Sequence, residues 1–213
     1  MIKRKNSSMI KGDSSEYELL AEAVKSSYKM KPDDYYLTCE IGVREGLGSK
    51  VIMDEMRTRN HGTHHHIGID PYGDIKYRHF DKEHDFIEHP KTDYTNLMKL
   101  RLKKDLIDYP NFHLMEMTDA EFMYRYRNGL TIYENKPKTL DKYTVVHFDG
   151  PHTTVDVLSE VMFFCDRSHV GTTFCFDDYT LYKMDTIDKV CYEHGFRPIK
   201  KGNQKYVIRK EYN

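Results

Sequence analysis

The chain has 213 residues, of which 38% are hydrophobic and 31% charged, and its 33 Lys and Arg against 34 Asp and Glu give a formal net charge of -1. This length suits a single domain with one sizeable core, and the near-zero charge disfavours a general binder of nucleic acid or of a membrane surface, which needs a basic face. No uninterrupted apolar run approaches the roughly 20 residues that cross a bilayer, so no membrane partner is expected.

The first 34 residues are expected to form a polar tail, residues 1 to 14, followed by an amphipathic helix. From Glu16 to Tyr28 apolar residues recur at helical spacing, so this helix must lie against something. Further on, short apolar runs that predict strands alternate with amphipathic stretches that predict helices. In chain order, these elements are a strand from Tyr35 to Ile41, a helix from Ser49 as N-cap to about Arg59, a strand from His66 to Ile69, a helix from Tyr94 to Tyr109, a strand from Phe112 to Met117, a helix from Thr118 to about Asn128, a strand from Tyr143 to Phe148, a helix from Thr153 to Cys165, a strand from Gly171 to Phe176 and a helix from Leu181 to His194.

The end of the chain, FRPIKKGNQKYVIRK, predicts two strands joined by a turn, which is an antiparallel hairpin. A polar insertion at residues 71–93 and a polar loop before Tyr143 are expected to stay outside the core. The alternation of strand and helix predicts an α/β fold with a mainly parallel sheet covered on both faces. In such sheets ligands bind outside the carboxyl ends of the strands, so the polar residues at those ends are the functional candidates.

The first two strands end in residues that suit a nucleoside. Gly42, Gly46 and Gly48 follow the first strand, and glycines there let the backbone turn tightly beside a bound molecule. The spacing is not G-x-G-x-x-G, and a purely structural turn is the alternative. The second strand ends at Asp70, which can accept hydrogen bonds from two ribose hydroxyls or simply start a turn before Pro71. Together these features favour an adenosine-containing ligand.

Acidic residues end the fourth and fifth strands. Asp149 follows the fourth strand, and Asp177 and Asp178 follow the fifth, which we expect to be its neighbour. Three carboxylates in one small site repel one another unless their pKa values are raised or a cation joins them. A divalent cation is the natural solution, and an all-oxygen site suits Mg²⁺ or Mn²⁺. The alternative is that Asp178 caps the next helix and Asp149 only terminates its strand. His152 stands where it can remove a proton from a metal-bound hydroxyl, or else cap the helix that follows.

Together these segments resemble the class I S-adenosylmethionine-dependent methyltransferases, and within them the metal-dependent O-methyltransferases of the methyltransferase type 24, macrocin and catechol-like group. The resemblance covers about Tyr35 to Arg209 and lies in EIGVREG, GID, VVHFDGPH and GTTFCFDDY, in that order. It implies a methyltransferase domain of residues 35–213 with a Rossmann-like, doubly wound, mostly parallel seven-stranded sheet that ends in the antiparallel hairpin. It also implies S-adenosylmethionine as cofactor and a small hydroxylated acceptor, such as a sugar or a phenol.

The resemblance also implies roles for individual residues. Those expected to contact the cofactor are Glu40, Gly42, Gly46, Asp70, Asp119, Ala120 and Asp149. Within this set, Glu40 and Gly42 line the methionine and ribose portion, Asp70 binds the ribose hydroxyls, and the Asp119-Ala120 pair approaches the adenine. The residues that match the family's metal ligands are Asp149, Asp177 and Asp178.

The residue that removes the acceptor's proton is where the chain departs from the family. Macrocin-like relatives place an acidic base two residues after the first metal aspartate, where this chain has Pro151. Catechol-type relatives place a lysine three residues after it, where this chain has His152. His152 and Asp149 are therefore predicted as the catalytic residues.

The polar insertion at residues 71–93 is predicted to act as a lid over the acceptor pocket, with the N-terminal helix as a wall, although a solvated loop explains it almost as well. Many of the 12 histidines lie in or beside this segment, namely His61, His64, His65, His66, His79, His84 and His89. A zinc site lacks support from an H-x-x-x-H helix or a cysteine partner. His64 to His66 are instead expected to begin a strand with some side chains exposed.

The four cysteines and the first residues bear on the compartment. Cys39, Cys165, Cys175 and Cys191 stand in apolar segments without a CxxC pair, which favours buried free thiols in a reducing compartment over a disulfide or zinc framework. The start, MIKRKNSSMIKG, is basic but lacks the apolar stretch of a secretory signal. We therefore expect a cytoplasmic protein.

Two functions from other classes stay open. A nucleic-acid methyltransferase is disfavoured, because DGPH does not match the N/D-P-P-Y/F segment expected after the fourth strand and the chain lacks a basic excess. A non-catalytic binding protein that keeps the fold without the chemistry is the stronger rival. The acceptor and the oligomeric state cannot be read from the sequence, and a homodimer stays open.

Overall fold

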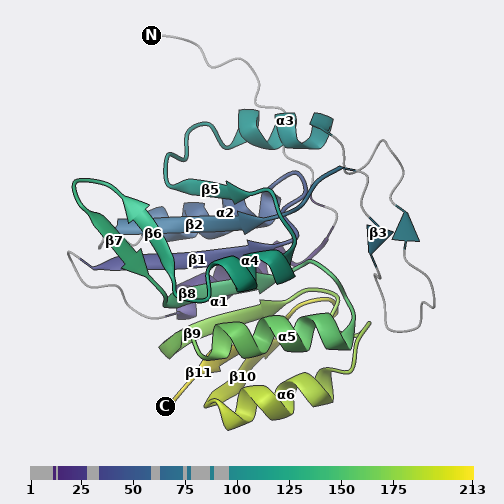
Figure 1. Ribbon diagram of the computed structural model, residues 1–213. Helices are drawn as coiled ribbons and strands as arrows, with labels where there is room; N and C mark the ends of the chain where they lie inside the picture. The colour runs from purple at the N-terminus through teal and green to yellow at the C-terminus, as the bar shows by residue number, and fades with distance from the viewer. Residues whose placement is uncertain are drawn as a thin grey trace.

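Seven strands form one sheet in the computed structural model, which describes residue 12 and residues 14–27, 34–58, 63–73, 76–77, 87–88 and 96–213. The strand order across the sheet is β10-β11-β9-β8-β1-β2-β5 (Figure 1). The strands are β1 Tyr35–Ile41, β2 Thr63–Ile69, β5 Phe112–Met115, β8 Tyr143–Phe148, β9 Ser168–Phe176, β10 Phe196–Lys201 and β11 Tyr206–Lys210. β11 runs antiparallel to β10 and β9, and the other neighbours pair in parallel. The predicted sheet with its C-terminal antiparallel hairpin is confirmed.

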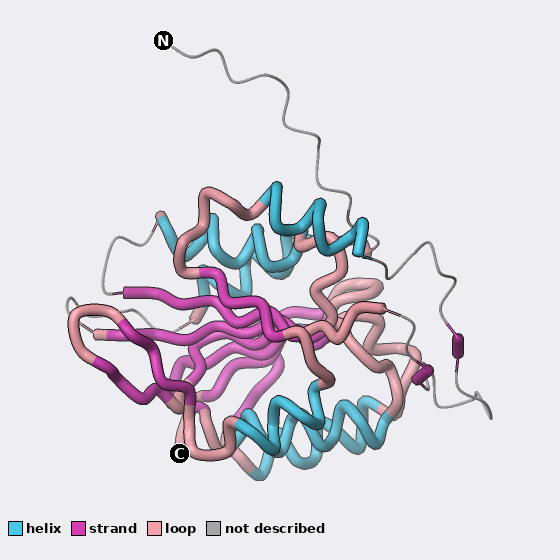
Figure 2. The backbone as a smooth tube through the Cα atoms, turned by 45° about the horizontal axis from the view of Figure 1, so that its top comes forward, coloured by secondary structure: helices cyan, strands magenta, loops and turns pink. Residues whose placement is uncertain are grey.

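Helices cover both faces of this sheet (Figure 2). They are α1 Tyr17–Ser26, α2 Leu47–Arg57, α3 Asn96–Asp105, α4 Asp119–Arg125, α5 Thr154–Cys165 and α6 Met184–Glu193. On one face α1 and α2 pack in a cluster with Tyr36, Val145 and Val207 of the strands. On the other face α5 and α6 pack on a larger cluster that includes Phe148 and Phe174. The architecture is therefore the doubly wound, Rossmann-like α/β fold that the sequence predicts.

The two faces of the central strand β1 differ in polarity. Leu37, Cys39 and Ile41 point into the apolar cluster beneath α5 and α6. Because successive side chains of a strand point to opposite faces, Thr38 and Glu40 point the other way, and the carboxylate of Glu40 bonds to Ser49 of α2. The side of the sheet that faces α2 therefore carries polar groups in its interior.

The start of α2 differs from the prediction. Gly46 is the N-cap residue and the helix begins at Leu47, so Ser49 is not the cap. Ser49 is instead fully buried within the first turns of the helix. Its hydroxyl donates a hydrogen bond to the buried carboxylate of Glu40. The role of Ser49 is therefore to bind this carboxylate and not to cap the helix.

The segment before β8 is a hairpin, so the expectation of a polar loop is wrong. Its strands are β6 Leu130–Tyr133 and β7 Pro137–Leu140, which pair antiparallel. The side chains of Leu130 and Ile132 are buried in the main core, and Thr131 and Tyr133 between them are exposed. This alternation of apolar and exposed side chains is the pattern of a strand with one buried face.

The expectation that some side chains of His64 to His66 are exposed is wrong for His65 and His66, whereas His64 is half-buried. His65 is 2% exposed and His66 fully buried, because β2 lies between β1 and β5 within the sheet. His65 contacts Glu134 of the β6–β7 hairpin, and His66 contacts Ser49 of α2 on the other face. Both faces of β2 are therefore covered.

Little of the predicted lid lies within the described residues. The strands β3 Lys76–Tyr77 and β4 Ile87–Glu88 pair antiparallel, beyond the carboxyl ends of the main strands in Figure 1. The rest of the prediction for residues 74–93 falls outside the described residues. So do His61, His79, His84 and His89.

The four cysteines are buried and free, which confirms the prediction of free thiols. In the part of the chain that the structure describes, no helix combines the length and the hydrophobicity that crossing a bilayer requires.

Phe174 of β9 anchors the core on the α5 and α6 face. Its ring is fully buried. The ring centroid lies 4.3 Å from that of Phe196 and 5.3 Å from that of Phe148. Phe174→Ala is expected to lower the free energy of unfolding by about 3 to 5 kcal/mol, since it removes buried apolar surface and leaves a cavity. Urea denaturation followed by circular dichroism measures the change.

The matched control for this substitution is Val170→Ala on the same strand, because Val170 is 42% exposed. Its effect is expected to stay within about 0.5 kcal/mol. Equal losses for the two variants would contradict the assignment of Phe174 to the core.

Candidate active site

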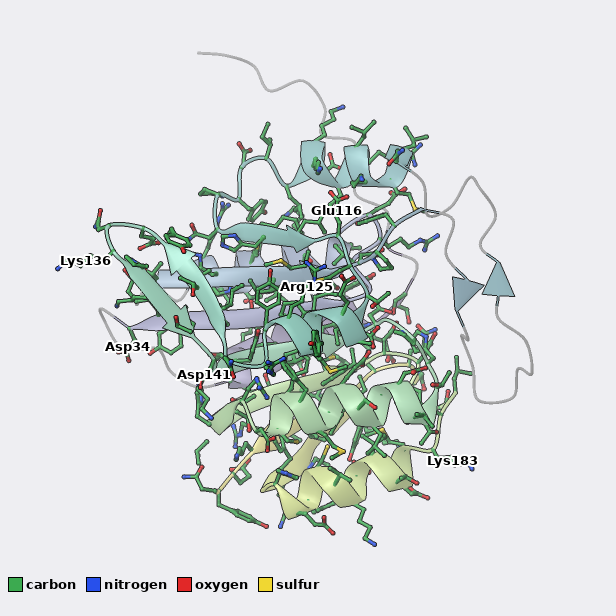
Figure 3. All side chains as sticks on the ribbon, viewed as in Figure 1. Asp34, Glu116, Arg125, Lys136, Asp141 and Lys183 are labelled. Atoms are coloured by element: carbon green, nitrogen blue, oxygen red, sulfur yellow. The ribbon has the colours of Figure 1, made fainter. Side chains whose placement is uncertain are left out.

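The loops that follow the parallel strands meet at one edge of the sheet. In Figure 3, Asp34 and Asp141, which precede β1 and β8, lie at one end of the strands. Lys183, which precedes α6, lies at the opposite end. The residues predicted to bind ligands follow β1, β2, β8 and β9 and therefore gather at this carboxyl edge.

A tight turn joins β1 to α2 at this edge. Gly42 has a φ of 80° and Gly46 a φ of 88°, in the left-handed region that favours glycine. A Cβ atom at Gly42 would lie 1.9 Å from the carbonyl oxygen of Asp149, so a side chain there would push the ends of β1 and β8 apart. The turn leads straight into the N-terminus of α2, where backbone N–H groups lack partners within the helix.

Asp70, at the end of β2, ties this turn to the next loop. Its Oδ2 accepts a hydrogen bond from the backbone N–H of Arg44 at 2.9 Å, and its Oδ1 accepts one from Tyr72 at 3.0 Å. The Tyr72 hydroxyl donates to the carbonyl of Arg44 at 2.6 Å. Asp70 is 1% exposed, and this burial raises its pKa to about 6 although the backbone hydrogen bonds act to lower it.

Glu40 is bonded within the protein. Its Oε1 lies 2.9 Å from Nδ1 of His147 on the neighbouring strand β8, and its Oε2 accepts a hydrogen bond from Ser49. Both Glu40 and His147 are almost fully buried. A Cβ atom at Gly48 would lie 1.8 Å from Glu40 Oε1, so the small residues at the start of α2 make room for a carboxylate inside the core.

Lys205, just before β11, places its ammonium group in this buried polar region. Its Nζ donates to Asp177 Oδ1 at 2.6 Å and to Ser14 Oγ at 3.0 Å, and lies 3.3 Å from His147 Nε2. Ser14 Oγ in turn donates to Asp177 Oδ1 at 2.8 Å. Lys205 is fully buried, so its charge is balanced by Asp177 rather than by water.

Asp149 and Asp177 lie side by side, as predicted from the ends of β8 and β9. Burial, and then the negative charge of Asp177, raise the pKa of Asp149 well above its usual range. Burial acts in the same direction on Asp177, but the charges of Lys205 and His147 and the hydrogen bonds from Asp149 and Lys205 together outweigh it and lower the pKa of Asp177. The ammonium of Lys205 thus lies against the carboxylate of Asp177, and the carboxyl of Asp149 lies beside that pair.

His152 joins this pair, whereas Asp178 does not. One ligand atom each of His152, Asp149 and Asp177 lie within 4.8 Å of one another. The ring of His152 is buried and stacks on Tyr182, with centroids 6.3 Å apart. Asp178 has a φ of 46° and is absent from the groups of described residues whose ligand atoms converge.

The convergent groups fit the expected magnesium site poorly. In the described part of the chain they are Glu40, His147 and Asp149, and Asp149, His152 and Asp177. Each contains an imidazole where an all-oxygen set was expected, and Mg²⁺ prefers oxygen ligands. Glu40 and His147 already bond to each other, and Asp177 Oδ1 already holds the ammonium of Lys205. Of the three predicted metal ligands, Asp149 and Asp177 therefore converge together with His152, and Asp178 does not join them.

A line of hydrogen bonds continues from the site across the sheet. His66 Nε2 lies 2.9 Å from Ser49 Oγ, and Thr38 Oγ1 lies 2.8 Å from His66 Nδ1 and 2.7 Å from His64 Nε2. Burial lowers the pKa of His66 well below its usual range and that of His64 to about 3, so both rings are neutral near pH 7. From β2 to the end of β9 the line consists of His64, Thr38, His66, Ser49, Glu40, His147, Lys205 and Asp177.

The residues predicted near the adenine follow β5. Asp119 and Ala120 form the first turn of α4, which Thr118 caps by accepting a hydrogen bond from the backbone N–H of Glu121. Burial raises the pKa of Asp119, which also interacts with the buried Glu160 of α5. Ala120 is exposed.

A cavity of about 650 Å³ lies elsewhere, between β5 and the β6–β7 hairpin. His65 and His113 stand on its wall, with His65 Nδ1 3.0 Å from His113 Nε2. None of the residues predicted to bind the cofactor or a metal lines this cavity.

No protein-family model and no curated protein matches the chain. Among solved structures, the O-methyltransferase TomG from Streptomyces achromogenes, in complex with SAM, matches with a TM-score of 0.55 and 10% identity over 92% of this chain and 79% of that one. The O-methyltransferase from Bacillus cereus, in complex with SAH, matches with a TM-score of 0.54 and 7% identity over 94% and 82%. The ribosomal protein L11 methylase from Lactobacillus delbrueckii subsp. bulgaricus matches with a TM-score of 0.52 and 10% identity over 92% and 79%.

These likenesses extend over most of each chain, but the identities are too low to carry an activity or a substrate across. They show that the chain has the Rossmann-like fold of S-adenosylmethionine-dependent methyltransferases.

Three residues of the site were not predicted, namely Ser14, His147 and Lys205. A sequence signal exists for His147. The apolar segment VVHF contains this one histidine, and the apolar segment TCEI contains one carboxylate, Glu40. Polar groups in buried strands need partners, so the two segments together indicate a pair. Lys205 precedes an apolar run and Ser14 lies in a polar tail, so neither stands out from its surroundings.

The raised pKa of Asp70 predicts a pH dependence of stability. An acid whose pKa is higher in the folded state than in the unfolded state favours folding at low pH. Relative to Asp70→Asn, the free energy of unfolding of the wild type should be greatest near pH 4. Between pH 4 and pH 7 it should fall by about 2 kcal/mol as the pH rises through the Asp70 pKa of about 6. Urea denaturation of both proteins from pH 4 to pH 7 measures this difference.

The control is Asp141→Asn, at an exposed position before β8. A flat difference for Asp70→Asn over the same range would contradict the raised pKa.

Proposed function

We propose that this chain is an S-adenosylmethionine-dependent methyltransferase that methylates a hydroxyl of a small molecule, such as a sugar or a phenol. The observation that carries the proposal is the carboxyl edge of the sheet, where the Gly42 turn, Asp70 and the end of β8 at Asp149 are tied together. The fold adds support, since it is shared with O-methyltransferases whose structures contain SAM or SAH.

The protein's part in this reaction is mainly to hold and align two reactants. S-adenosylmethionine supplies a methyl group on a positively charged sulfur, which makes that methyl a strong electrophile. Gly42 lets the turn run close to a bound ligand, and the N-terminus of α2 follows directly. Correct alignment of an acceptor oxygen with the methyl group then accounts for much of the rate enhancement.

Asp70 is the proposed partner of the ribose hydroxyls. Its oxygens accept backbone hydrogen bonds from Arg44 and Tyr72, with Val43 as a further backbone donor, and two carboxylate oxygens offer about four acceptor sites in all. Because Asp70 is almost fully buried, binding requires the turn at Tyr72 to move aside. Glu40 bonds to both His147 and Ser49, so we propose that it stabilises the turn between β1 and α2.

Asp119 and Ala120 are the residues that we propose to contact the adenine of the cofactor.

His152 is the proposed general base. It lies beside the carboxyls of Asp149 and Asp177, so the proton that it takes from an acceptor hydroxyl produces an imidazolium next to negative charge. The segment at residues 71–93 remains the proposed lid. Assistance by Mg²⁺ or Mn²⁺ is not part of the proposal, because Lys205 already neutralises Asp177.

A non-catalytic binding protein is the second candidate. It is favoured by one observation, that Glu40 and Asp70 both have their oxygens engaged within the protein. Calorimetric titration with S-adenosylmethionine, followed by a product-detected screen of sugars and phenols, separates the two candidates. Cofactor binding without turnover across the screen would favour the binding protein.

Asp70→Ala is expected to weaken the binding of S-adenosylmethionine by about 10- to 100-fold, because it removes hydrogen bonds to a charged group. Calorimetry at pH 7.5 measures the dissociation constant. Asp141→Ala, at the opposite end of the strands (Figure 3), should leave it unchanged. If Asp70→Ala bound the cofactor as tightly as the wild type, the ribose assignment would be lost.

His152→Ala is expected to lower kcat by about 10²- to 10⁴-fold, the usual contribution of a general base, and to leave cofactor affinity unchanged. The measurement uses an acceptor found in the screen, over a range of pH. His169→Ala, on β9 at the opposite end of the strand from Asp177, is the control. An unchanged rate and pH profile would remove His152 from the mechanism.

A further inference from the structure

The buried ammonium of Lys205 lies where the sequence predicts a metal ion. A fully buried lysine is rare, because an ammonium group taken out of water must be paired. Here Nζ has Asp177 Oδ1 at 2.6 Å, Ser14 Oγ at 3.0 Å and His147 Nε2 at 3.3 Å around it. These contacts form a complete environment for a cation.

We propose that Lys205 is the fixed cation of this site, that it takes the place of the divalent metal, and that the site therefore has no specific affinity for Mg²⁺ or Mn²⁺. The inference rests on the proposed function only where it adds that methyl transfer runs without a divalent ion. The statement about metal affinity stands on the geometry alone.

The charge balance at the edge supports this assignment. Asp149 and Asp177 are the two carboxyls that a metal would bridge, and Asp177 Oδ1 is already bonded to Nζ. A divalent ion at Asp149, His152 and Asp177 would stand close to a positive charge that cannot reach solvent. Asp178, the third ligand that the sequence suggests, lies outside the convergent groups of the described residues.

The backbone holds Lys205 in place. Its N–H donates to Glu16 Oε2 at 3.0 Å, and its carbonyl accepts from the N–H of Gly202 at 2.8 Å across the hairpin turn. The same Glu16 carboxylate accepts from the N–H groups of Asn203 and Gln204. The lysine is thus fixed by a structured turn rather than by a mobile loop, so its charge cannot easily swing away to admit a metal ion.

Lys205 acts as a positioning residue. It bonds to Asp177 Oδ1, and it contacts one nitrogen of His147, whose other nitrogen contacts Glu40 beside the cofactor turn. An ammonium needs no loading from solution, whereas a metal ion does. The site is therefore complete in the protein as it folds.

The test is a titration of the full-length protein with Mn²⁺, read by the electron paramagnetic resonance signal of free Mn²⁺. The wild type is expected to bind no Mn²⁺ at a specific site at millimolar concentrations. Lys205→Met removes the ammonium and leaves Asp149, His152 and Asp177 in place, so it should bind Mn²⁺ at least about tenfold more tightly than the wild type. The double variant Lys205→Met, Asp177→Asn should lose the gained affinity.

Lys200→Met is the matched control, because Lys200 lies on the same hairpin with its side chain 52% exposed, and it should behave as the wild type. One tight Mn²⁺ site in the wild type that Asp177→Asn abolishes would overturn the proposal. So would a folded Lys205→Met that binds Mn²⁺ no better than the wild type. Circular dichroism shows whether that variant folds, and if it does not, the titrations of the wild type and of Asp177→Asn decide alone.

Calorimetry with S-adenosylmethionine separates this inference from the proposed function. The wild type is expected to bind the cofactor with the same affinity in EDTA and in MgCl₂. Failure to bind in either buffer would end the proposed function, while the Mn²⁺ titration would still decide the role of Lys205. Binding that requires MgCl₂ would count against Lys205 as the cation and leave the proposed function standing.

Discussion

The burial of two carboxylates, Glu40 and Asp177, inside an apolar α/β fold is the constraint on which this structure depends. A buried charge without a partner costs several kcal/mol, so each carboxylate needs an imidazole or ammonium from a neighbouring strand. His147 of β8 is the register partner of Glu40 in β1 and contacts Lys205 next to β11. A shift of the pairing by one residue would turn one member of a pair toward the apolar cluster on the opposite face. The line of hydrogen bonds from His64 to Asp177 therefore forms only with this strand order and this register.

The same constraint explains segments that are far apart in the sequence. Gly48 and Ser49 at the start of α2 are small because the carboxylate of Glu40 lies against them. Ahead of α1, Ser14 bonds to the site, and Glu16 accepts hydrogen bonds from three backbone N–H groups of the β10–β11 turn. Those bonds lower the pKa of Glu16, so its carboxylate stays charged near pH 7. Residues from both ends of the sequence therefore close one site.

Periodicity and strand-end residues were enough to predict the fold and the edge that carries the site. They predicted the alternation of strands and helices, the C-terminal hairpin, and the neighbouring positions of Asp149 and Asp177, because these follow from local patterns and the rules of parallel sheets. They missed the β6–β7 hairpin, whose short apolar alternation is set among polar residues. They could not place Lys205, since an isolated lysine before a strand is usually solvated. The direction of its side chain depends on the packing of β9 against β11 and on Ser14, and those contacts are not local.

The case of Lys205 shows why strand-end aspartates do not by themselves specify a metal. They require positive charge, but they do not fix its source. The ammonium of Lys205 is already bonded to Asp177 at 2.6 Å, so this edge carries a positive charge without a metal ion. A divalent ion about 4 Å from the ammonium would be repelled by about 8 kcal/mol at an effective dielectric constant of about 20. To be bound, it would have to displace Lys205 or recruit more carboxylates. The nature of the cation is therefore decided by Lys205, just before β11, whose side chain reaches the edge. The aspartate motif has to be interpreted together with that residue.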